Sequence, residues 1–179
     1  TLFRFGSGAF LVQCYRRLIE RELHKRASGK LRPSELREIL VRHIFGVDSD
    51  RDACRVTELS LLLTMLDYID PPDLQSYPTF RLPNLHNANI FESDFFAADS
   101  TWAAAQGTQR FDWIVGNPPW ISSSESEASR VAAHQWIVTN QRRRPVVRND
   151  VAEAFAWKVT DHLSSTGMAA MLLPAMSLF

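Results

Sequence analysis

Residues 111–120, FDWIVGNPPW, join a short apolar segment to a turn of the form Asn-Pro-Pro-aromatic. The segment from Phe111 to Val115 is largely apolar and ends at Gly116, which is typical of a strand buried on both faces of a sheet. Polar groups that follow such a strand lie at the carboxyl edge, where open α/β sheets bind their ligands. The stretch therefore predicts a parallel sheet with a binding site at the turn.

The turn has the chemistry to hold a planar amino group. Asn117 can supply a side-chain oxygen as one acceptor, and Pro118 keeps its carbonyl as a second one, with the backbone restrained by the adjoining Pro119. Trp120 offers a flat face for stacking. Two acceptors placed where positive charge develops on nitrogen would stabilise a transfer to it. These four residues are the candidate catalytic set, although Asn-Pro and Pro-Pro are also ordinary turn sequences.

Along the rest of the chain, the spacing of apolar residues and the residues that interrupt it predict strands that alternate with helices. We expect strands near residues 1–5, 43–48, 87–91, 111–115 and 168–174, and helices near 9–26, 34–41, 52–67 and 151–163. We expect irregular segments at 71–83 and 98–110 and a polar stretch at 122–150, mobile in its first half. The alternation predicts an α/β fold with a doubly wound, mostly parallel sheet.

Composition limits the function classes. With 179 residues, one domain is expected, and 20 basic against 20 acidic residues is not the charge balance of a stand-alone nucleic-acid binder. We expect no membrane association, because no apolar run is long enough and no signal peptide opens the chain. Cys14 and Cys54 lie far apart, so we expect two buried thiols, no metal site, and a reducing, cytoplasmic setting.

The strand ends predict a nucleoside pocket. Gly6 and Gly8 open the first helix, where missing side chains would let a ligand approach the backbone, although a tight turn explains them equally. Asp48 ends the second strand and is the expected acid for two ribose hydroxyls, with capping of the next helix as the alternative role. Asp50 competes for that capping role, and we assign it to the start of the helix.

The third strand end completes the predicted pocket. Asp94 follows that strand and can accept a hydrogen bond from an adenine amino group, while Phe95 or Ile90 would line the adenine ring. Four strand ends with suitable chemistry, in this order, are stronger evidence for the pocket than any one of them alone.

Four motifs follow one another along the chain: GSGAF, GVDSD, NIFESDFF and FDWIVGNPPW. In this order they resemble the motifs of the adenine-amino DNA methyltransferases of restriction-modification and phage-defence systems. The likeness extends from Gly6 to Phe179, and the closing segment is similar to the helix and strand after the catalytic turn in larger members, including enzymes fused to a nuclease. It implies a Rossmann-like class I methyltransferase fold, S-adenosylmethionine as cofactor, and double-stranded DNA as partner, with a linked or fused restriction nuclease. The implied reaction methylates a flipped-out adenine without a metal.

Mapped onto this sequence, the resemblance implies two groups of site residues. The Asn-Pro-Pro-aromatic turn, Asn117 to Trp120, holds the adenine. The implied cofactor-binding residues are Gly6, Gly8, Phe10, Asp48, Asp94 and Phe95.

The chain departs from the family pattern before the glycine turn. Leu2 to Phe5 stand where the family usually has Asp-Pro-any-Cys, and loss of that aspartate predicts weaker cofactor binding. We expect residues 1–179 to be one partial catalytic domain without its target-recognition domain. Such a fragment is expected to select no DNA sequence and to be inactive by itself.

Other functions fit parts of the same pattern. A protein glutamine methyltransferase uses an Asn-Pro-Pro turn for the same electronic reason, but the large face of Trp120 and the basic insert favour a nucleobase. Structured RNA is an alternative source of adenine, and a catalytically silent binding module would explain the altered Leu2 to Phe5 segment. A dehydrogenase is disfavoured, because Leu11 occupies the third-glycine position. The arginines at 142–144 and 148 either contact phosphates or lie in a solvated loop.

Overall fold

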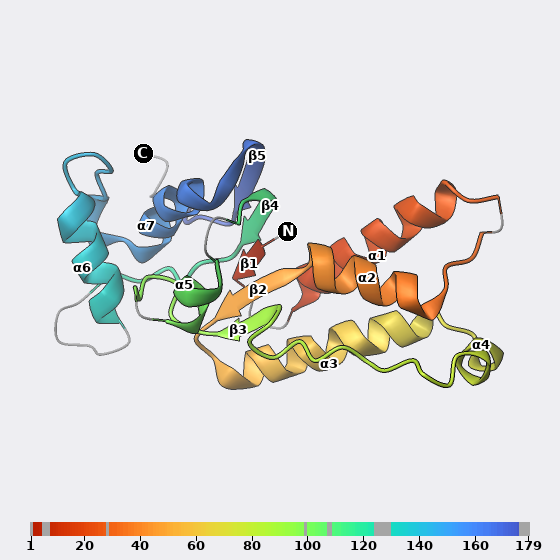
Figure 1. Cartoon of the computed structure of the whole chain (residues 1–179). Coiled ribbons are helices and arrows are strands. Elements are labelled where there is room, and N and C mark those ends of the chain that lie inside the picture. Colours follow the sequence, from red (N-terminus) through yellow and green to blue (C-terminus); the bar gives the residue numbers. More distant parts are fainter. Residues whose placement is uncertain are drawn as a thin grey trace.

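The structure is a computed structural model that describes residues 2–4, 8–27, 29–98, 100–106, 109–123 and 130–175. Its five strands form one sheet in the order β3-β2-β1-β4-β5, and every neighbouring pair is parallel. The strands are β1 (Leu2–Arg4), β2 (Phe45–Asp48), β3 (Ile90–Glu92), β4 (Phe111–Gly116) and β5 (Leu163–Met171). The predicted parallel α/β fold is confirmed (Figure 1).

The strand that leads into the Asn-Pro-Pro turn lies inside the sheet. In β4, Ile114 is paired with Leu2 of β1 on one side and with Ala169 of β5 on the other. The register between β4 and β5 shifts beside Phe111. Gly167 makes this possible, because a Cβ there would come within 2.6 Å of the Phe111 carbonyl oxygen.

Helices occupy both sides of the sheet. They are α1 (Ala9–His24), α2 (Pro33–His43), α3 (Arg51–Asp67), α4 (Pro71–Ser76), α5 (Thr101–Gln106), α6 (Val131–Asn140) and α7 (Val151–Lys158), with 3₁₀ turns η2 (Val147–Asn149) and η3 (Val159–His162). Figure 1 shows α1, α2 and α3 extending together away from the sheet, with α4 at their far end. No helix in the part of the chain that the structure describes is long and apolar enough to cross a membrane.

Consecutive strand residues point to opposite faces and so feed two separate cores. The neighbours Ile90 and Phe91 of β3 belong to different clusters. The aliphatic core consists of Leu11, Tyr15, Ile19, Leu31, Leu36, Leu40, Ile44, Cys54, Leu61, Met65, Ile69, Leu85 and Ile90. The aromatic core consists of Val47, Phe91, Phe95, Phe96, Trp102, Phe111, Ile114, Ala133, Ile137, Val146, Val151, Ala154, Phe155 and Val159.

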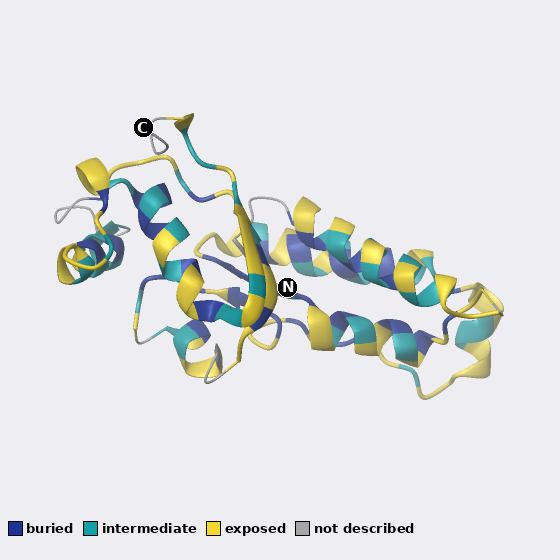
Figure 2. Cartoon of the chain, turned by 90° about the horizontal axis from the view of Figure 1, so that it is seen from above, coloured by how far each residue is buried: buried dark blue, intermediate teal, exposed yellow. Residues whose placement is uncertain are grey.

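The long helices form as the apolar spacing predicts. In α1, Leu11, Tyr15 and Ile19 recur every four residues and are fully buried. Figure 2 shows buried positions recurring along the helices that extend from the sheet. Helix α3 starts as expected at Asp50, whose Oδ1 accepts hydrogen bonds from the N–H groups of Asp52 at 2.8 Å and Ala53 at 3.1 Å.

The start of α2 differs from the expectation. The helix was expected near residues 34–41, but it begins at Pro33, and Arg32 takes the cap position. Proline suits the first helical position, because its fixed φ fits the helix and its missing N–H would be unpaired there. The Glu35 carboxylate then accepts the Arg32 N–H at 2.8 Å, which completes the cap.

Three helices form where irregular chain was expected. Helix α4 starts with prolines in its first two positions, and α5 is anchored by Trp102, which is 2 % exposed in the aromatic core. Helix α6 occupies part of the polar stretch, because Ala133 and Ile137, four residues apart, are buried. Residues 124–129, in the half expected to be mobile, lie outside the described residues.

The last helix and strand also differ from the prediction. Helix α7 ends at Lys158, and the chain continues as η3 before β5. A strand was expected near residues 168–174, but β5 begins earlier, at Leu163, and most of it is exposed, including Met168. In this chain β5 pairs only with β4 among the described residues, which leaves it at the edge of the sheet. Cys54 is buried as expected, whereas Cys14 is only half-buried.

Candidate active site

A cavity of about 480 Å³ lies at the carboxyl ends of β2, β3 and β4. Its polar wall contains Asp48 and Ser49 after β2, and Ser93 and Asp94 after β3. The cavity has the volume of a small-ligand site, and it lies at the sheet edge where open α/β folds bind ligands.

The remaining walls come from the turn and the aromatic core. Pro119 and Ile121 contribute from the segment after β4, and the rings of Phe95, Phe96 and Phe155 close the other side. Apolar walls around a few polar groups are the usual composition of a ligand pocket.

Asp48 is fixed in place at the end of β2. The residue is 7 % exposed, and its Oδ1 accepts the N–H of Asp50 at 3.0 Å. Its carbonyl accepts the N–H of Ser93 at 2.7 Å, so the ends of β2 and β3 are tied together. The Asp48 carboxylate is therefore held beside the cavity by the turn that starts α3.

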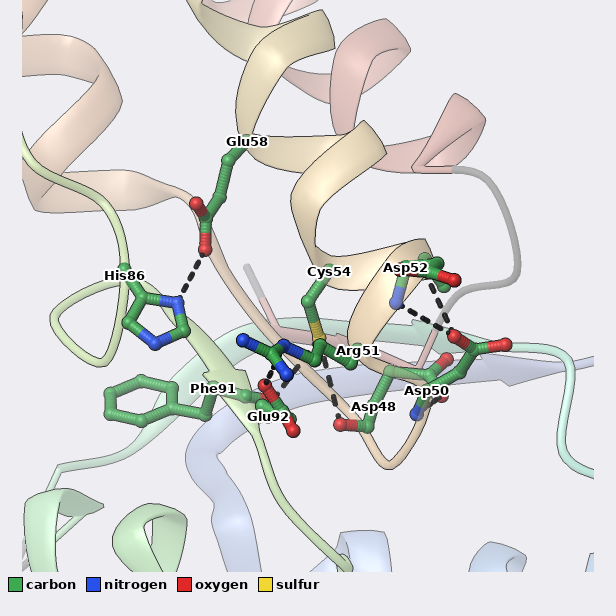
Figure 3. A network of polar contacts seen from close by, with 10 residues as sticks. Asp48, Asp50, Arg51, Asp52, Cys54, Glu58, His86, Phe91 and Glu92 are labelled. Atoms are coloured by element: carbon green, nitrogen blue, oxygen red, sulfur yellow. Dashed lines mark hydrogen bonds and ion pairs between the residues drawn. The ribbon is translucent and has the colours of Figure 1, made fainter.

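Cys54 links the same two strands to α3 (Figure 3). Its thiol donates to the carbonyl of Asp48 at 3.6 Å and to the carbonyl of Phe91 at 3.7 Å. Burial, together with the nearby Asp48 carboxylate, raises the pKa of Cys54 to about 12. The thiol therefore stays protonated at neutral pH and serves as a donor, not as a nucleophile.

Two pairs of polar side chains brace this edge from outside the cavity. Arg51 Nε lies 3.9 Å from Glu92 Oε2, and His86 Nδ1 lies 3.0 Å from Glu58 Oε1 (Figure 3). Pairs as exposed as these contribute at most about 1 kcal/mol each, so the packing of α3 on the strands positions the edge.

The Asp94 turn places an acid and an aromatic ring at the end of β3. Asp94 Oδ1 accepts the N–H of Phe96 at 2.8 Å, which tightens the turn. Phe95 is 5 % exposed and stacks on Phe155 with ring centroids 4.9 Å apart and an interplanar angle of 11°. Phe95 is thus a core residue with one edge in the cavity wall. Ile90 was the alternative ring-lining residue, but it faces the aliphatic core.

The Asn-Pro-Pro-Trp turn borders the cavity but enters its wall only at Pro119. Pro118 is buried, whereas Asn117 and Trp120 are exposed, Trp120 by 59 %. The indole N–H of Trp120 donates to the carbonyl of Leu172 at 3.2 Å, and the N–H of Leu172 donates to Gly116 at 3.0 Å. The chain after β5 therefore orients the indole and leaves much of the ring exposed for stacking.

The exit of the turn is held by contacts that no sequence pattern predicts. Residues 121–123 run antiparallel to residues 149–151, with Val151 N–H donating to Ile121 at 2.9 Å and Ser123 N–H donating to Asn149 at 2.7 Å. From α6, His134 Nδ1 lies 3.1 Å from Ser123 Oγ. These pairings leave no signal in the sequence, because they join segments more than ten residues apart.

The arginine cluster divides into two groups. Arg144 binds the Asp161 carboxylate through two nitrogens and lies 5.7 Å from the ring centroid of Trp136, so it is neither in a solvated loop nor directed to a ligand. Arg142, Arg143 and Arg148 are exposed.

Part of the predicted glycine turn can be placed. Gly6 lies outside the described residues. Gly8 is buried with φ +70°, and a Cβ there would come within 2.5 Å of Thr57 Oγ1. Glycine is needed at this position both for the left-handed backbone and for the close approach of α1 to α3. Phe10 is 42 % exposed near the start of α1, and neither Gly8 nor Phe10 lines the cavity.

The cavity thus gathers four of the predicted site residues, Asp48, Asp94, Phe95 and Pro119. Two carboxylates at adjacent strand ends beside an aromatic wall fit a nucleoside, because ribose hydroxyls and an exocyclic amino group are donors. The roles of all the predicted site residues remain predictions.

Comparison with known proteins gives a match to one family and a similarity in fold to a solved structure. A family model described as Eco57I restriction-modification methylase matches residues 42–179. A solved structure described as a cryoEM structure of a DrdV–DNA complex is similar over 98 % of this chain, with a TM-score of 0.64 and 15 % sequence identity. At that identity the likeness concerns the fold, and this chain spans 17 % of the length of the DrdV chain. No curated protein sequence matches.

Proposed function

Because this chain belongs to the Eco57I restriction-modification methylase family, we propose that it is the catalytic core of an S-adenosylmethionine-dependent DNA adenine methyltransferase. The proposed product is the methylated 6-amino group of an adenine swung out of the duplex. The observation that carries this proposal is one cavity whose wall combines Asp48, Asp94 and Pro119 of the catalytic turn. The doubly wound, Rossmann-like class I arrangement belongs to the same proposal.

Each cofactor-binding residue has a specific role in the proposal. S-adenosylmethionine, when bound, supplies a methyl group activated by a positively charged sulfur. The Asp48 carboxylate accepts hydrogen bonds from ribose hydroxyls, and Asp94 accepts one from the adenine amino group of the cofactor. Phe95 provides the apolar wall beside that ring. Gly8 and Phe10 at the start of α1 are proposed to approach the cofactor from outside the cavity wall, and Gly6 is assigned to the same role from the sequence.

The turn acts on the target base. The Asn117 side-chain oxygen and the Pro118 carbonyl accept the two N–H groups of the target amine, which stabilises positive charge as its nitrogen forms the new bond. Trp120 stacks on the extruded adenine and offsets part of the cost of unstacking it. The excess proton then leaves to water.

The partners proposed are double-stranded DNA and a linked or fused restriction nuclease. DrdV was solved as a complex with DNA, which supports the first partner, and the restriction-modification description of the family supports both. The neutral charge balance of this chain means that the DNA contacts must be local or lie in other parts of the protein.

The test gives the full-length protein unmethylated DNA and labelled S-adenosylmethionine, beside an Asn117→Ala variant. We expect label on adenine with the wild type and a loss of at least about 100-fold in rate with the variant, since a transition-state acceptor is removed. Asn84→Ala, an exposed asparagine in the connection before β3, is the matched control and should keep full activity.

Other outcomes would redirect the assignment. Label on protein would favour a glutamine methyltransferase, and label on RNA alone would favour an RNA adenine methyltransferase. Calorimetry distinguishes the silent binding module, because an absence of heat with S-adenosylmethionine at millimolar concentration would contradict an active enzyme.

A further inference from the structure

A strained arginine lies next to the exit of the catalytic turn. Arg148 has φ 53° and ψ 26°, and the following Asn149 has φ 55°. Asparagine tolerates the left-handed region and glycine adopts it freely, but arginine enters it only at a cost. We name residues 147–150 the Arg148 turn.

Backbone contacts hold this strained conformation in place. The N–H of Val147 donates to Glu153 Oε2 at 2.8 Å, the N–H of Asp150 donates to the Val147 carbonyl at 3.0 Å, and the N–H of Glu153 donates to Asp150 Oδ1 at 3.1 Å. The carbonyl of Asn149 also accepts the N–H of Ser123. The Arg148 turn is therefore fixed both to the start of α7 and to the segment that leaves the Asn117–Trp120 turn.

The Arg148 side chain does not compensate for the strain within the described residues. It is exposed and forms no hydrogen bond or ion pair there, whereas Arg144, four positions earlier, is paired with Asp161. A strained residue whose side chain forms no hydrogen bond or ion pair with the described residues points to a role outside the chain.

We propose that Arg148 is a positioning residue that binds a backbone phosphate of the DNA strand whose adenine enters the Asn117–Trp120 turn. This inference rests on the proposed function. A guanidinium binds phosphate through two parallel hydrogen bonds, and phosphate contacts set the register of a protein on DNA without reading its sequence. Because the Arg148 turn is tied to residue 123, the contact would fix the strand relative to the catalytic turn.

The test measures DNA binding and methylation by the full-length protein with Arg148→Gly. Glycine removes the guanidinium and suits the left-handed backbone, so the melting temperature should stay the same or rise. We expect DNA to bind about fivefold more weakly at moderate salt, with the slope of log K against log salt reduced by about 1. KM for DNA should rise in parallel while kcat stays unchanged.

Two variants make the result specific. Arg148→Lys keeps the charge but loses the planar group that forms two parallel hydrogen bonds to phosphate. It should therefore have the salt slope of the wild type but only part of its affinity. Arg37→Ala removes an exposed arginine on α2 and should change neither quantity.

The two proposals fail in different ways. Unchanged affinity and salt slope in Arg148→Gly, with wild-type DNA methylation intact, would overturn the phosphate contact alone. A lower melting temperature with an unchanged salt slope would instead make Arg148 a structural residue. A wild-type protein that neither binds nor methylates DNA would remove the proposed function, and the phosphate contact with it.

Discussion

The two faces of the sheet are built from different side chains on helices of different length. The aliphatic core is covered by α1, α2 and α3, with 16, 11 and 17 residues, and most of its members are leucine and isoleucine. The aromatic core lies under α5, α6 and α7, with 6, 10 and 8 residues.

The cavity belongs to one of these faces only. Six residues of its wall, Val47, Phe95, Phe96, Ala133, Val151 and Phe155, are members of the aromatic core, and none belongs to the aliphatic core. We infer that the aliphatic core serves as a scaffold, whereas the aromatic core is scaffold and binding wall at once. Substitutions in the aliphatic core should therefore lower stability alone, whereas substitutions in the aromatic core should lower both stability and cofactor affinity.

Replacing Phe155 should give the largest effect and reduce both the stability of the fold and the affinity for the cofactor. The ring is 4 % exposed, stacks on Phe95 and lies in the cavity wall. We expect Phe155→Ala to lower the free energy of unfolding by about 4 kcal/mol, because a large buried side chain is lost. Cofactor affinity should fall as well, since Phe95 loses its stacking partner. Urea denaturation and calorimetry at a temperature where the variant is folded measure the two effects separately.

Leu61 provides the matched substitution on the other face. It is fully buried on α3 in the aliphatic core. Leu61→Ala should cost about 3 kcal/mol of unfolding free energy by opening a cavity, but leave the cofactor affinity of the folded protein unchanged. If the two variants lost cofactor affinity equally, the separation of scaffold from binding wall would be wrong.

Gly8 tests how closely the scaffold is packed at the start of α1. Gly8→Ala places a Cβ within 2.5 Å of Thr57 Oγ1 and strains a backbone with φ +70°. We expect a loss of about 2 kcal/mol in thermal or urea denaturation. Adding Thr57→Ala should recover only part of it, because the left-handed backbone stays strained. Full recovery would show that the contact with Thr57, not the backbone, requires the glycine.

The length and apolar periodicity of each element explain which elements the sequence could predict. Helix α1 repeats a buried residue every four positions over 16 residues, so its periodicity is unambiguous. The short helix α5 has one dominant anchor, Trp102, and six residues give no measurable period. Pattern reasoning therefore identified α1, α2, α3 and α7, and it missed the short helices α4 and α5 as well as α6.

The place of the candidate site residues at the sheet edge was predictable for a different reason. Asp48 ends β2, Asp94 lies two residues after β3, and the Asn117–Trp120 turn starts directly after β4. Parallel strands bring these carboxyl ends to one edge of the sheet. The antiparallel contact between residues 121–123 and 149–151 was not predictable, because it depends on backbone atoms that carry no sequence signal. The Arg148 turn was missed likewise, since arginine gives no indication of a positive φ.

His162 gives the smallest expected effect and tests the aromatic core through pH. The ring is 7 % exposed between Phe95 and Trp102, and burial, reinforced by the charge of Lys158, lowers the pKa of His162 from 6.5 to about 4. The unfolded chain therefore binds the proton first as pH falls, so stability is complete above pH 6.5 and declines between pH 6.5 and about 4. In His162→Gln this decline should shrink, measured by urea denaturation across the same range. An unchanged decline would mean that the aromatic core does not keep this histidine neutral.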